Sequence, residues 1–261
     1  ANANKLLVRF LLEQCEKTDL RLCDIQAGGL HNAIPREAHA TVAVPTAYAA
    51  TFVTELEAFV AKVREEFSVT EPDLTAALEA VDAASTCICP EQAVRMLKSL
   101  SVVHNGIFAM SQDLEGLVET SSNLASVRKQ GNQVVATTSQ RSSVASNLEY
   151  MALVVRSAFE LGGAKCVTNE GYPGWKMNPK SEILKVCVES YKRLFGKEPL
   201  VRAIHAGLEC GLFSEKYPNL DMVSFGPTLR GVHSPDERLL IPTVQMVWDH
   251  LLDVLKNIPA K

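Results

Sequence analysis

Hydrophobic residues recur along this chain with two different periods, which predict helices in some segments and strands in others. In residues 4–17 the apolar side chains return at the spacing of one face of an amphipathic helix. Alternating apolar and polar residues at 20–26 and 38–44 predict two strands. The clearest helix is predicted at 46–67, whose apolar stripe consists of Phe52, Leu56, Phe59, Val60, Val63 and Phe67. Residues 74–81 are expected to form a strand, although their alanine and glutamate residues suit a helix equally well.

The order strand, strand, helix, strand recurs further along the chain. Strands are predicted at 117–127 and 133–139, a helix at 143–161 and a further strand at 165–169. A helix at 90–101 separates the two copies. The copies share no residue pattern, so they indicate a duplicated layer of structure and not a sequence repeat. We therefore expect an α/β fold whose first domain is an antiparallel sheet covered by helices, with binding loops at its rim.

A segment rich in proline and glycine, 172–179, marks a boundary between this domain and the rest of the chain. Beyond it, a helix is expected at 181–195, with a serine as its N-cap and a glycine directly after its end. Short apolar strands are predicted at 199–204 and 222–225, and a closing helix at 243–258. Strands that alternate with helices favour a parallel sheet, in which ligands bind beyond the carboxyl ends of the strands.

The composition indicates a globular protein and argues against two classes of partner. The chain has 261 residues, of which 47% are hydrophobic and 21% charged, and its formal net charge is -4. This length suggests one large or two medium domains. A mildly acidic chain with scattered lysines and arginines lacks the basic stripes that bind nucleic acids and anionic membranes. No apolar run reaches the length of a membrane span.

The cysteines indicate a reducing compartment, which we expect to be the cytoplasm. There are seven, an odd number, and Cys15 and Cys187 lie at core-like positions. The sequence shows neither a signal peptide nor the cysteine density of a disulfide scaffold. Cys87 and Cys89 are spaced too closely for a Cys-x-x-Cys zinc knuckle or redox pair. They are expected to be free thiols in a loop before the helix at 90–101.

The segment 226–238, GPTLRGVHSPDER, places His233 in a loop between a predicted buried strand and a helix start. Imidazole on a loop held between rigid elements suits a metal site, because ligand geometry must be fixed before the metal arrives. The same residues also fit a plain helix N-terminus, with Ser234 as N-cap and Glu237 completing a capping box. His205 likewise follows a predicted strand, where α/β sheets bind ligands. The alternative for both histidines is an ordinary loop residue.

Four segments resemble a known family in the same order along the chain. They are GGLHNAIPREA at 28–38, DLEGLVETS at 113–121, YPGW at 172–175 and HAGLECGLF at 205–213. Together with the His-Ser-Pro-Asp-Glu that begins at His233, they resemble the bacterial cytosolic aminoacyl-histidine dipeptidases of the di-zinc aminopeptidase and carboxypeptidase superfamily. The resemblance covers essentially the whole chain. No His-Glu-x-x-His, Walker, dinucleotide or nucleophile-elbow motif occurs, so the expected chemistry rests on this resemblance.

The resemblance implies that the chain corresponds to the second half of such an enzyme. Residues 1–174 would form its lid or dimerisation domain, and 175–261 the C-terminal segment of its catalytic domain. The general base and most of the metal ligands would come from a half that lies outside this sequence. A homodimer is also implied, because lid domains of this superfamily commonly mediate dimerisation.

The resemblance further implies roles for individual residues. His233 would be the one ligand that this half gives to a pair of zinc ions, with cobalt or manganese as alternatives. Arg141 would bind the C-terminal carboxylate of the substrate through its planar, bidentate guanidinium, the alternative being a surface arginine near a helix start. Asn32 matches a family asparagine near the substrate, and it equally suits a turn in a glycine-rich loop.

The loop that begins at His205 would line the substrate pocket mainly through its backbone, with Gly207 allowing a close approach. His205 would alternatively stabilise the oxyanion or contact the substrate side chain, and the sequence does not choose between these roles. We take His205 and Glu209 as candidate catalytic residues and Gly207 as a candidate substrate-binding residue. The expected function is hydrolysis of dipeptides, Xaa-His substrates included, by a metal-activated water. The alternative is a non-catalytic lid or dimerisation module without a metal pair.

Overall fold

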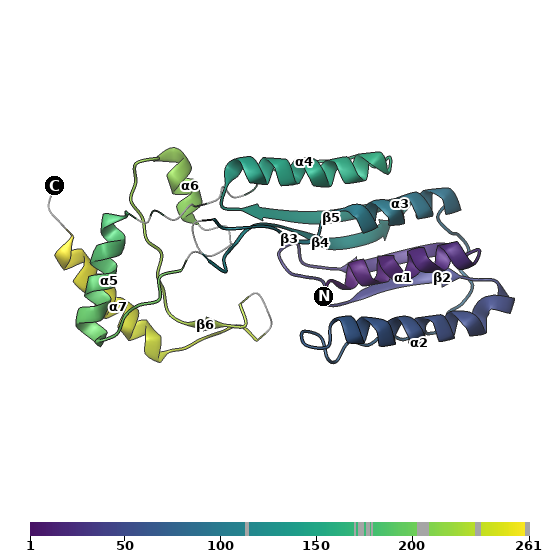
Figure 1. Ribbon diagram of the computed structural model, residues 1–261, viewed down its shortest axis with the longest axis horizontal. Coiled ribbons are helices and arrows are strands. Elements are labelled where there is room, and N and C mark those ends of the chain that lie inside the picture. Colours follow the sequence, from purple (N-terminus) through teal and green to yellow (C-terminus); the bar gives the residue numbers. More distant parts are fainter. Residues whose placement is uncertain are drawn as a thin grey trace. The chain divides into compact units, whose positions relative to one another are not determined.

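The computed structural model describes residues 1–112, 115–169, 180–202, 209–232 and 236–258, together with residues 171, 175 and 178. The chain divides into two compact units, Ala1–Glu170 and Gly171–Lys261, whose elements are labelled in Figure 1. The first unit contains, in chain order, α1 (Ala3–Lys17), β1 (Arg21–Gly28), β2 (Ala38–Ala43), the 3-10 turn η1 (Thr46–Tyr48), α2 (Ala49–Glu66), α3 (Pro90–Val102), β3 (Gly106–Met110), β4 (Val118–Gln130), β5 (Gln133–Ser142) and α4 (Ala145–Leu161).

Strand β4 organises the sheet of the first unit. One of its edges pairs with β5, from Thr120 opposite Ser142 to Gln130 opposite Gln133. The other edge is shared by two strands, with β3 on the first part of β4 and β1 on residues 126–128. Strand β2 pairs with β1, and every pairing in this sheet is antiparallel. The predicted antiparallel sheet is therefore confirmed.

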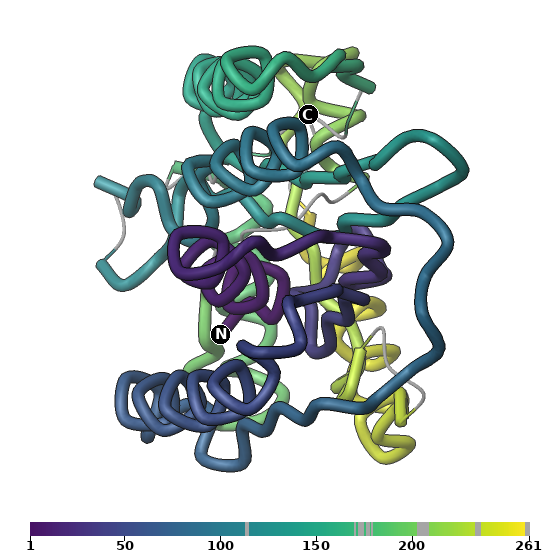
Figure 2. Tube along the Cα trace, turned by 90° about the vertical axis from the view of Figure 1, so that its right-hand side faces the viewer, coloured from purple at the N-terminus to yellow at the C-terminus, as the bar shows by residue number. Residues whose placement is uncertain are grey.

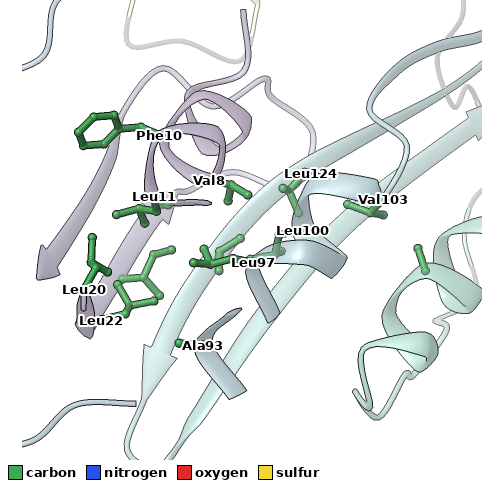
Figure 3. Close-up of a cluster of buried hydrophobic side chains, with 14 of the residues drawn as sticks. Val8, Phe10, Leu11, Leu20, Leu22, Ala93, Leu97, Leu100, Val103 and Leu124 are labelled. Atoms are coloured by element: carbon green, nitrogen blue, oxygen red, sulfur yellow. The ribbon is translucent and has the colours of Figure 1, made fainter. Parts of the chain in front are cut away.

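The four helices of this unit lie on one side of the strands (Figure 2), and their apolar faces form the core against the sheet. The helical period decides which residues of α1 are buried: Val8 and Leu11 are 1% and 2% exposed. Figure 3 shows these two side chains together with Leu97 of α3 and Leu124 of β4. No helix of this unit covers the opposite face of the sheet in the part of the chain that the structure describes.

The structure differs from the sequence prediction at two segments of this unit. Residues 74–81 form no strand. Leu74 packs against the core from an irregular segment, and residues 75–81 belong to a stretch, 75–87, in which every side chain is exposed. Residues 165–169 are also irregular. Strand β3, in contrast, is absent from the prediction. It is a short strand with mostly exposed side chains, so its sequence carries little alternation, and its pairing with β4 defines it.

The second unit contains α5 (Glu182–Phe195), α6 (Glu209–Lys216), the two-residue strands β6 (Leu229–Arg230) and β7 (Arg238–Leu239), and α7 (Pro242–Asn257). The predicted boundaries of α5 are confirmed. The Ser181 hydroxyl accepts a hydrogen bond from the amide of Leu184 at 3.0 Å, and the helix ends at Gly196, whose φ of 64° is left-handed.

Helices α5 and α7 form the core of the second unit. Cys187 of α5 and Val254 of α7 are buried between them. The strands predicted at 199–204 and 222–225 are not formed at any of their described residues, 199–202 and 222–225. A strand exists only where its backbone hydrogen bonds are paired with a neighbour, and these described residues have no such neighbour. Residues 203–204 lie outside the described part of the chain.

Candidate functional site

Arg141 lies near the end of β5, four residues before α4 begins, and it is partly buried. Its register partner on β4 is Ser121. The next residue, Ser142, fixes this end of the strand. Its hydroxyl lies 2.8 Å from the Thr120 hydroxyl, and it accepts a 3.0 Å hydrogen bond from the amide of Val144, at the start of α4. The position of Arg141 is therefore set by the sheet and by the helix that follows.

Asn32 lies in a turn between β1 and β2, and hydrogen bonds hold this loop at three points. The Asn123 Nδ2 donates to the carbonyl oxygen of Ala33 at 2.8 Å. The amide of Ala3 donates to the carbonyl oxygen of Pro35 at 3.1 Å, and the amide of Gly28 donates to the carbonyl oxygen of Glu37 at 3.0 Å. The loop that carries Asn32 is thus attached to the sheet and to the first helix.

A buried asparagine, Asn2, supports the same loop through its hydrogen bond to Asn123. The Asn2 side chain is the N-cap of α1, since its Oδ1 accepts from the amide of Lys5 at 3.2 Å. Its Nδ2 donates to Asn105 Oδ1 at 2.9 Å, to Asn123 Oδ1 at 3.1 Å and to the carbonyl of Leu124 at 3.1 Å. Sequence reasoning missed this network, because its members come from three distant parts of the chain.

Gly28 allows the loop to approach the sheet. Its φ is +71°, and a Cβ at this position would lie 2.1 Å from the carbonyl oxygen of Ala125. No side chain fits at that distance, and the left-handed conformation itself favours glycine. The glycine pair at the start of the sequence segment 28–38 was a visible signal of a turn. No feature of the sequence indicated the close contact between Gly28 and β4.

Arg141 and Asn123, the residue that holds the Asn32 loop, share one face of the sheet. Along β4, Leu124 points to the helices and is fully buried. Because side chains alternate along a strand, Asn123 and Ser121 point to the opposite face. Arg141, as the partner of Ser121, shares that face. Asn123 contacts the carbonyl oxygen of Ala33, the neighbour of Asn32, so the Asn32 loop is attached to the strand that pairs with Arg141.

Of the other candidate residues, one belongs to the second unit and three lie outside the described part of the chain. Glu209 is the exposed first residue of α6, in the second unit. His205, Gly207 and His233 lie outside the described residues.

The described residues do not fit a metal pair. No group of three or more histidine, cysteine, aspartate or glutamate side chains that could hold a metal ion occurs among them. His250, a buried histidine, is a core residue. Its Nε2 lies 2.9 Å from the carbonyl oxygen of Cys187, and its ring packs 4.7 Å from that of Phe225.

The second unit contains a cavity of about 610 Å³ between α5, α7 and the segments 197–202 and 222–228. Its walls are mainly apolar and include Trp175, Tyr191 and Phe225, with His250 beside them. Among the described residues that line it, none is a candidate site residue, and Glu198 is the only carboxylate. The described walls of this cavity are thus mainly apolar.

Comparison with known proteins supports the predicted resemblance. A family profile described as a peptidase dimerisation domain matches residues 1–71. The chain is 40% identical over 260 residues to the cytosol non-specific dipeptidase of Escherichia coli (strain K12), an alignment that covers 100% of this chain and 54% of that protein. The crystal structure of aminoacylhistidine dipeptidase from Vibrio alginolyticus matches with a TM-score of 0.87 and 39% identity, over 100% of this chain and 53% of that one.

These matches confirm the resemblance to the aminoacyl-histidine dipeptidases and the predicted fold class. The chain spans about half the length of the relatives it matches. In the described part of the chain, no helix is both long enough and apolar enough to cross a membrane.

Proposed function

We propose that this chain is part of a metal-dependent dipeptidase that hydrolyses unblocked dipeptides, Xaa-His substrates included. The observation that carries the proposal is similarity to two dipeptidases along the entire chain, at 40% and 39% identity. In this proposal residues 1–174 form the lid and dimerisation domain, and residues 175–261 form the C-terminal segment of the catalytic domain.

Arg141 binds the C-terminal carboxylate of the substrate in this proposal. A guanidinium group offers a planar fork of donors that matches a carboxylate, and it remains charged at all physiological pH values. The position of Arg141 supports this role, since it lies at the end of β5 on the face shared with the Asn32 loop. Asn32 then supplies a side-chain amide to the same substrate.

His233 is proposed as the single ligand that this chain gives to a pair of zinc ions, with cobalt or manganese as alternatives. A metal pair polarises the scissile carbonyl and lowers the pKa of a bound water. The described residues do not gather such a site, so the remaining ligands and the general base are assigned to polypeptide beyond this chain. His205, Gly207 and Glu209 are proposed to line the same substrate pocket.

Exposed apolar side chains in the second unit support the need for additional polypeptide. Leu200 and Ile241 are 82% and 78% exposed. Exposed residues on α7 also include Val244, Met246, Trp248, Leu252 and Leu255. A soluble domain rarely leaves so much apolar surface in contact with water unless another element covers it. The relatives, which are nearly twice as long, have the extra chain to do so.

We also propose a homodimer and a cytoplasmic location, each supported by one observation. The match of residues 1–71 to a peptidase dimerisation domain supports a homodimer formed through the first unit. The relative from Escherichia coli is described as a cytosol enzyme, which supports a cytoplasmic location. Neither nucleic acid nor membrane is proposed as a partner.

A second candidate function is a non-catalytic lid or dimerisation module. Its support is that the first unit has its own sheet, four helices and a continuous hydrophobic core. In that case the chain would dimerise and bind no metal pair.

One experiment separates the two functions. We would measure bound zinc and hydrolysis of β-alanyl-histidine for this chain alone, and for the chain produced together with a polypeptide covering the rest of the relatives' length. The dipeptidase proposal expects little metal and no turnover for the chain alone, turnover in the combined preparation, and loss of that turnover in His233→Ala. Two tightly bound metals with turnover in the chain alone would show that the second half needs no partner. A well-folded combined preparation without metal or turnover would favour the module.

A further inference from the structure

Three cysteines gather where β1 begins, although they come from two distant segments. Cys23 belongs to β1, whereas Cys87 and Cys89 lie just before α3. The amide of Ile88 donates a 2.8 Å hydrogen bond to the carbonyl oxygen of Leu22, and this bond holds the two segments together.

The same hydrogen bond limits the distance between the backbones of Cys23 and Cys87. The Ile88 nitrogen belongs to the peptide group that begins with the Cys87 carbonyl carbon. The Leu22 oxygen belongs to the peptide group that ends with the Cys23 nitrogen. The two cysteines therefore flank a single hydrogen bond between their peptide groups, and we infer that their Cα atoms can reach the span of about 4.4–6.8 Å that a disulfide needs.

The two thiols have different environments. Cys23 is 6% exposed, yet it is not a member of the hydrophobic core between helices and sheet. Burial raises the pKa of its thiol, and the charge of Cys87 raises it further, against smaller opposing effects of the Ala43 amide and Lys129. Cys87 is exposed. The guanidinium of Arg21 interacts electrostatically with both Cys87 and Cys89, so a cation lies beside the exposed thiols.

We propose that Cys23 and Cys87 form an oxidisable pair, with Cys87 as the thiol that reacts with a hydroperoxide and Cys23 as the thiol that resolves the product. The Cys87 thiolate attacks hydrogen peroxide, an S–O bond forms, the O–O bond breaks, and the departing hydroxide takes a proton to become water. The Cys23 sulfur then attacks the Cys87 sulfenic acid. The S–S bond forms, the S–O bond breaks, and a second water leaves with the Cys23 proton. Two thiols and one peroxide give one disulfide and two waters.

A Cys23–Cys87 disulfide would have a structural consequence, because Cys87 lies near the end of the long connection between α2 and α3. Figure 2 shows this connection as an open stretch of chain, and residues 75–87 are all exposed and irregular. A covalent bond at Cys87 would add to the Ile88 hydrogen bond as an attachment of this stretch to β1. Disulfides that exist in a reducing compartment are typically transient and redox-sensing, and an exposed partner keeps this one accessible to reductants.

The test is peroxide treatment of the whole chain, followed by alkylation of free thiols and mass mapping of the peptides. Cys89→Ser is the matched control, because it removes a neighbouring exposed thiol outside the pair. We expect the parent chain and Cys89→Ser to lose two alkylatable thiols each and to yield a Cys23–Cys87 peptide that dithiothreitol separates. The parent chain starts with seven free cysteines.

Substitution at either member should abolish the link. Because Cys23 is buried, Cys87→Ala is the primary variant, and its folding can be compared with that of the parent by circular dichroism. We expect no disulfide in Cys87→Ala and an accumulating sulfenic acid at Cys87 in Cys23→Ala, trapped with dimedone. A Cys87–Cys89 bridge in the parent chain would overturn the proposal. So would an over-oxidised Cys87 beside a reduced Cys23.

Discussion

The side-chain amide of Asn123 donates a 2.8 Å hydrogen bond to the carbonyl oxygen of Ala33, and this contact attaches the loop that carries Asn32 to strand β4. Asn123 lies two residues from Ser121, the register partner of Arg141. This contact joins residues 90 positions apart, and it ties the loop of one proposed substrate-binding residue to the strand that pairs with the other.

Asn123→Ala should loosen this loop. The substitution leaves the Ala33 carbonyl without its donor and removes an acceptor of the Asn2 amide, so we expect a loss of about 1–3 kcal/mol in the free energy of unfolding. Urea unfolding of the chain measures it. Ser139→Ala is the matched control, since Ser139 is the register partner of Asn123 on β5. Equal stability of the two variants would contradict the role assigned to Asn123.

Gly28→Ala should be far more costly than an alanine at another left-handed glycine. At Gly28 the new Cβ would lie 2.1 Å from the Ala125 carbonyl oxygen, whereas at Gly131, with φ of +58°, nothing lies within 4 Å. We expect Gly131→Ala to cost about 1–2 kcal/mol from backbone strain alone. Gly28→Ala should exceed this because the strand or the loop must shift as well. Thermal unfolding of both variants checks the order, and a smaller effect at Gly28 would show that the loop relaxes freely.

Arg141→Lys should weaken substrate binding in the combined preparation while the metal content stays unchanged. Lysine keeps the charge but cannot form a bidentate contact with a carboxylate. A lost charge-assisted hydrogen bond is worth about 1.5–3 kcal/mol, which corresponds to a rise in KM of about 10- to 150-fold. The control substrate is a dipeptide amide, which lacks the carboxylate. If Arg141→Lys affects the amide as strongly as the free dipeptide, the arginine does not bind that carboxylate.

Asp221 should make the stability of the second unit dependent on pH. Burial acts to raise the pKa of this carboxyl, but hydrogen bonds from the Ser181 side chain and from the amides of Ile183, Glu182 and Met222 outweigh it, and the pKa falls below 3.8. The Ile183 amide at the start of α5 donates at 3.0 Å. A carboxyl whose folded pKa is lowered stabilises the protein above its unfolded pKa, and this contribution is lost as the pH falls through the folded pKa.

The measurement is urea unfolding of the parent chain and Asp221→Asn between pH 7 and pH 2, followed by circular dichroism. We expect the parent to be more stable at pH 7 and the difference to shrink below pH 4. Glu215→Gln serves as a control, because Glu215 is an exposed carboxyl of the same unit on another helix, α6. A difference between parent and Asp221→Asn that stays constant down to pH 2 would mean that the charge of Asp221 has no role at this helix.

Much of the first unit was predictable from local patterns. The helices α1, α2, α3 and α4 follow apolar stripes or proline starts, and strands β1, β2, β4 and β5 follow alternation or a hairpin. Strand β3 was not predictable, because its apolar side chains are largely exposed and only the partner residues on β4 make it a strand. The strand expected at 74–81 was a wrong prediction. Its sequence was ambiguous between strand and helix, and residues 75–81 are exposed and belong to no strand.

The candidate site shows the same division. Arg141 was predictable as a residue at the end of a strand, and Asn32 as a residue in a glycine-rich loop. Their common face was not, because it depends on the β4–β5 register and on a shift in that register between Leu124 and Ser126. The asparagine network that begins at Asn2 was also hidden, since no sequence pattern relates its members.

The sequence by itself determined the helix and strand periods, the Ser181 cap, the Gly196 stop and the resemblance that points to dipeptide hydrolysis. These signals are local, because side chains a few residues apart and the terminal amides of a helix decide them. Only the tertiary structure decided that Asn123 holds the Asn32 loop, that Arg141 shares the face of Asn123, and that the segment of Cys87 is hydrogen-bonded to that of Cys23. Those contacts join residues far apart in the chain, and their closeness depends on strand register and on the packing of helices over one face of the sheet.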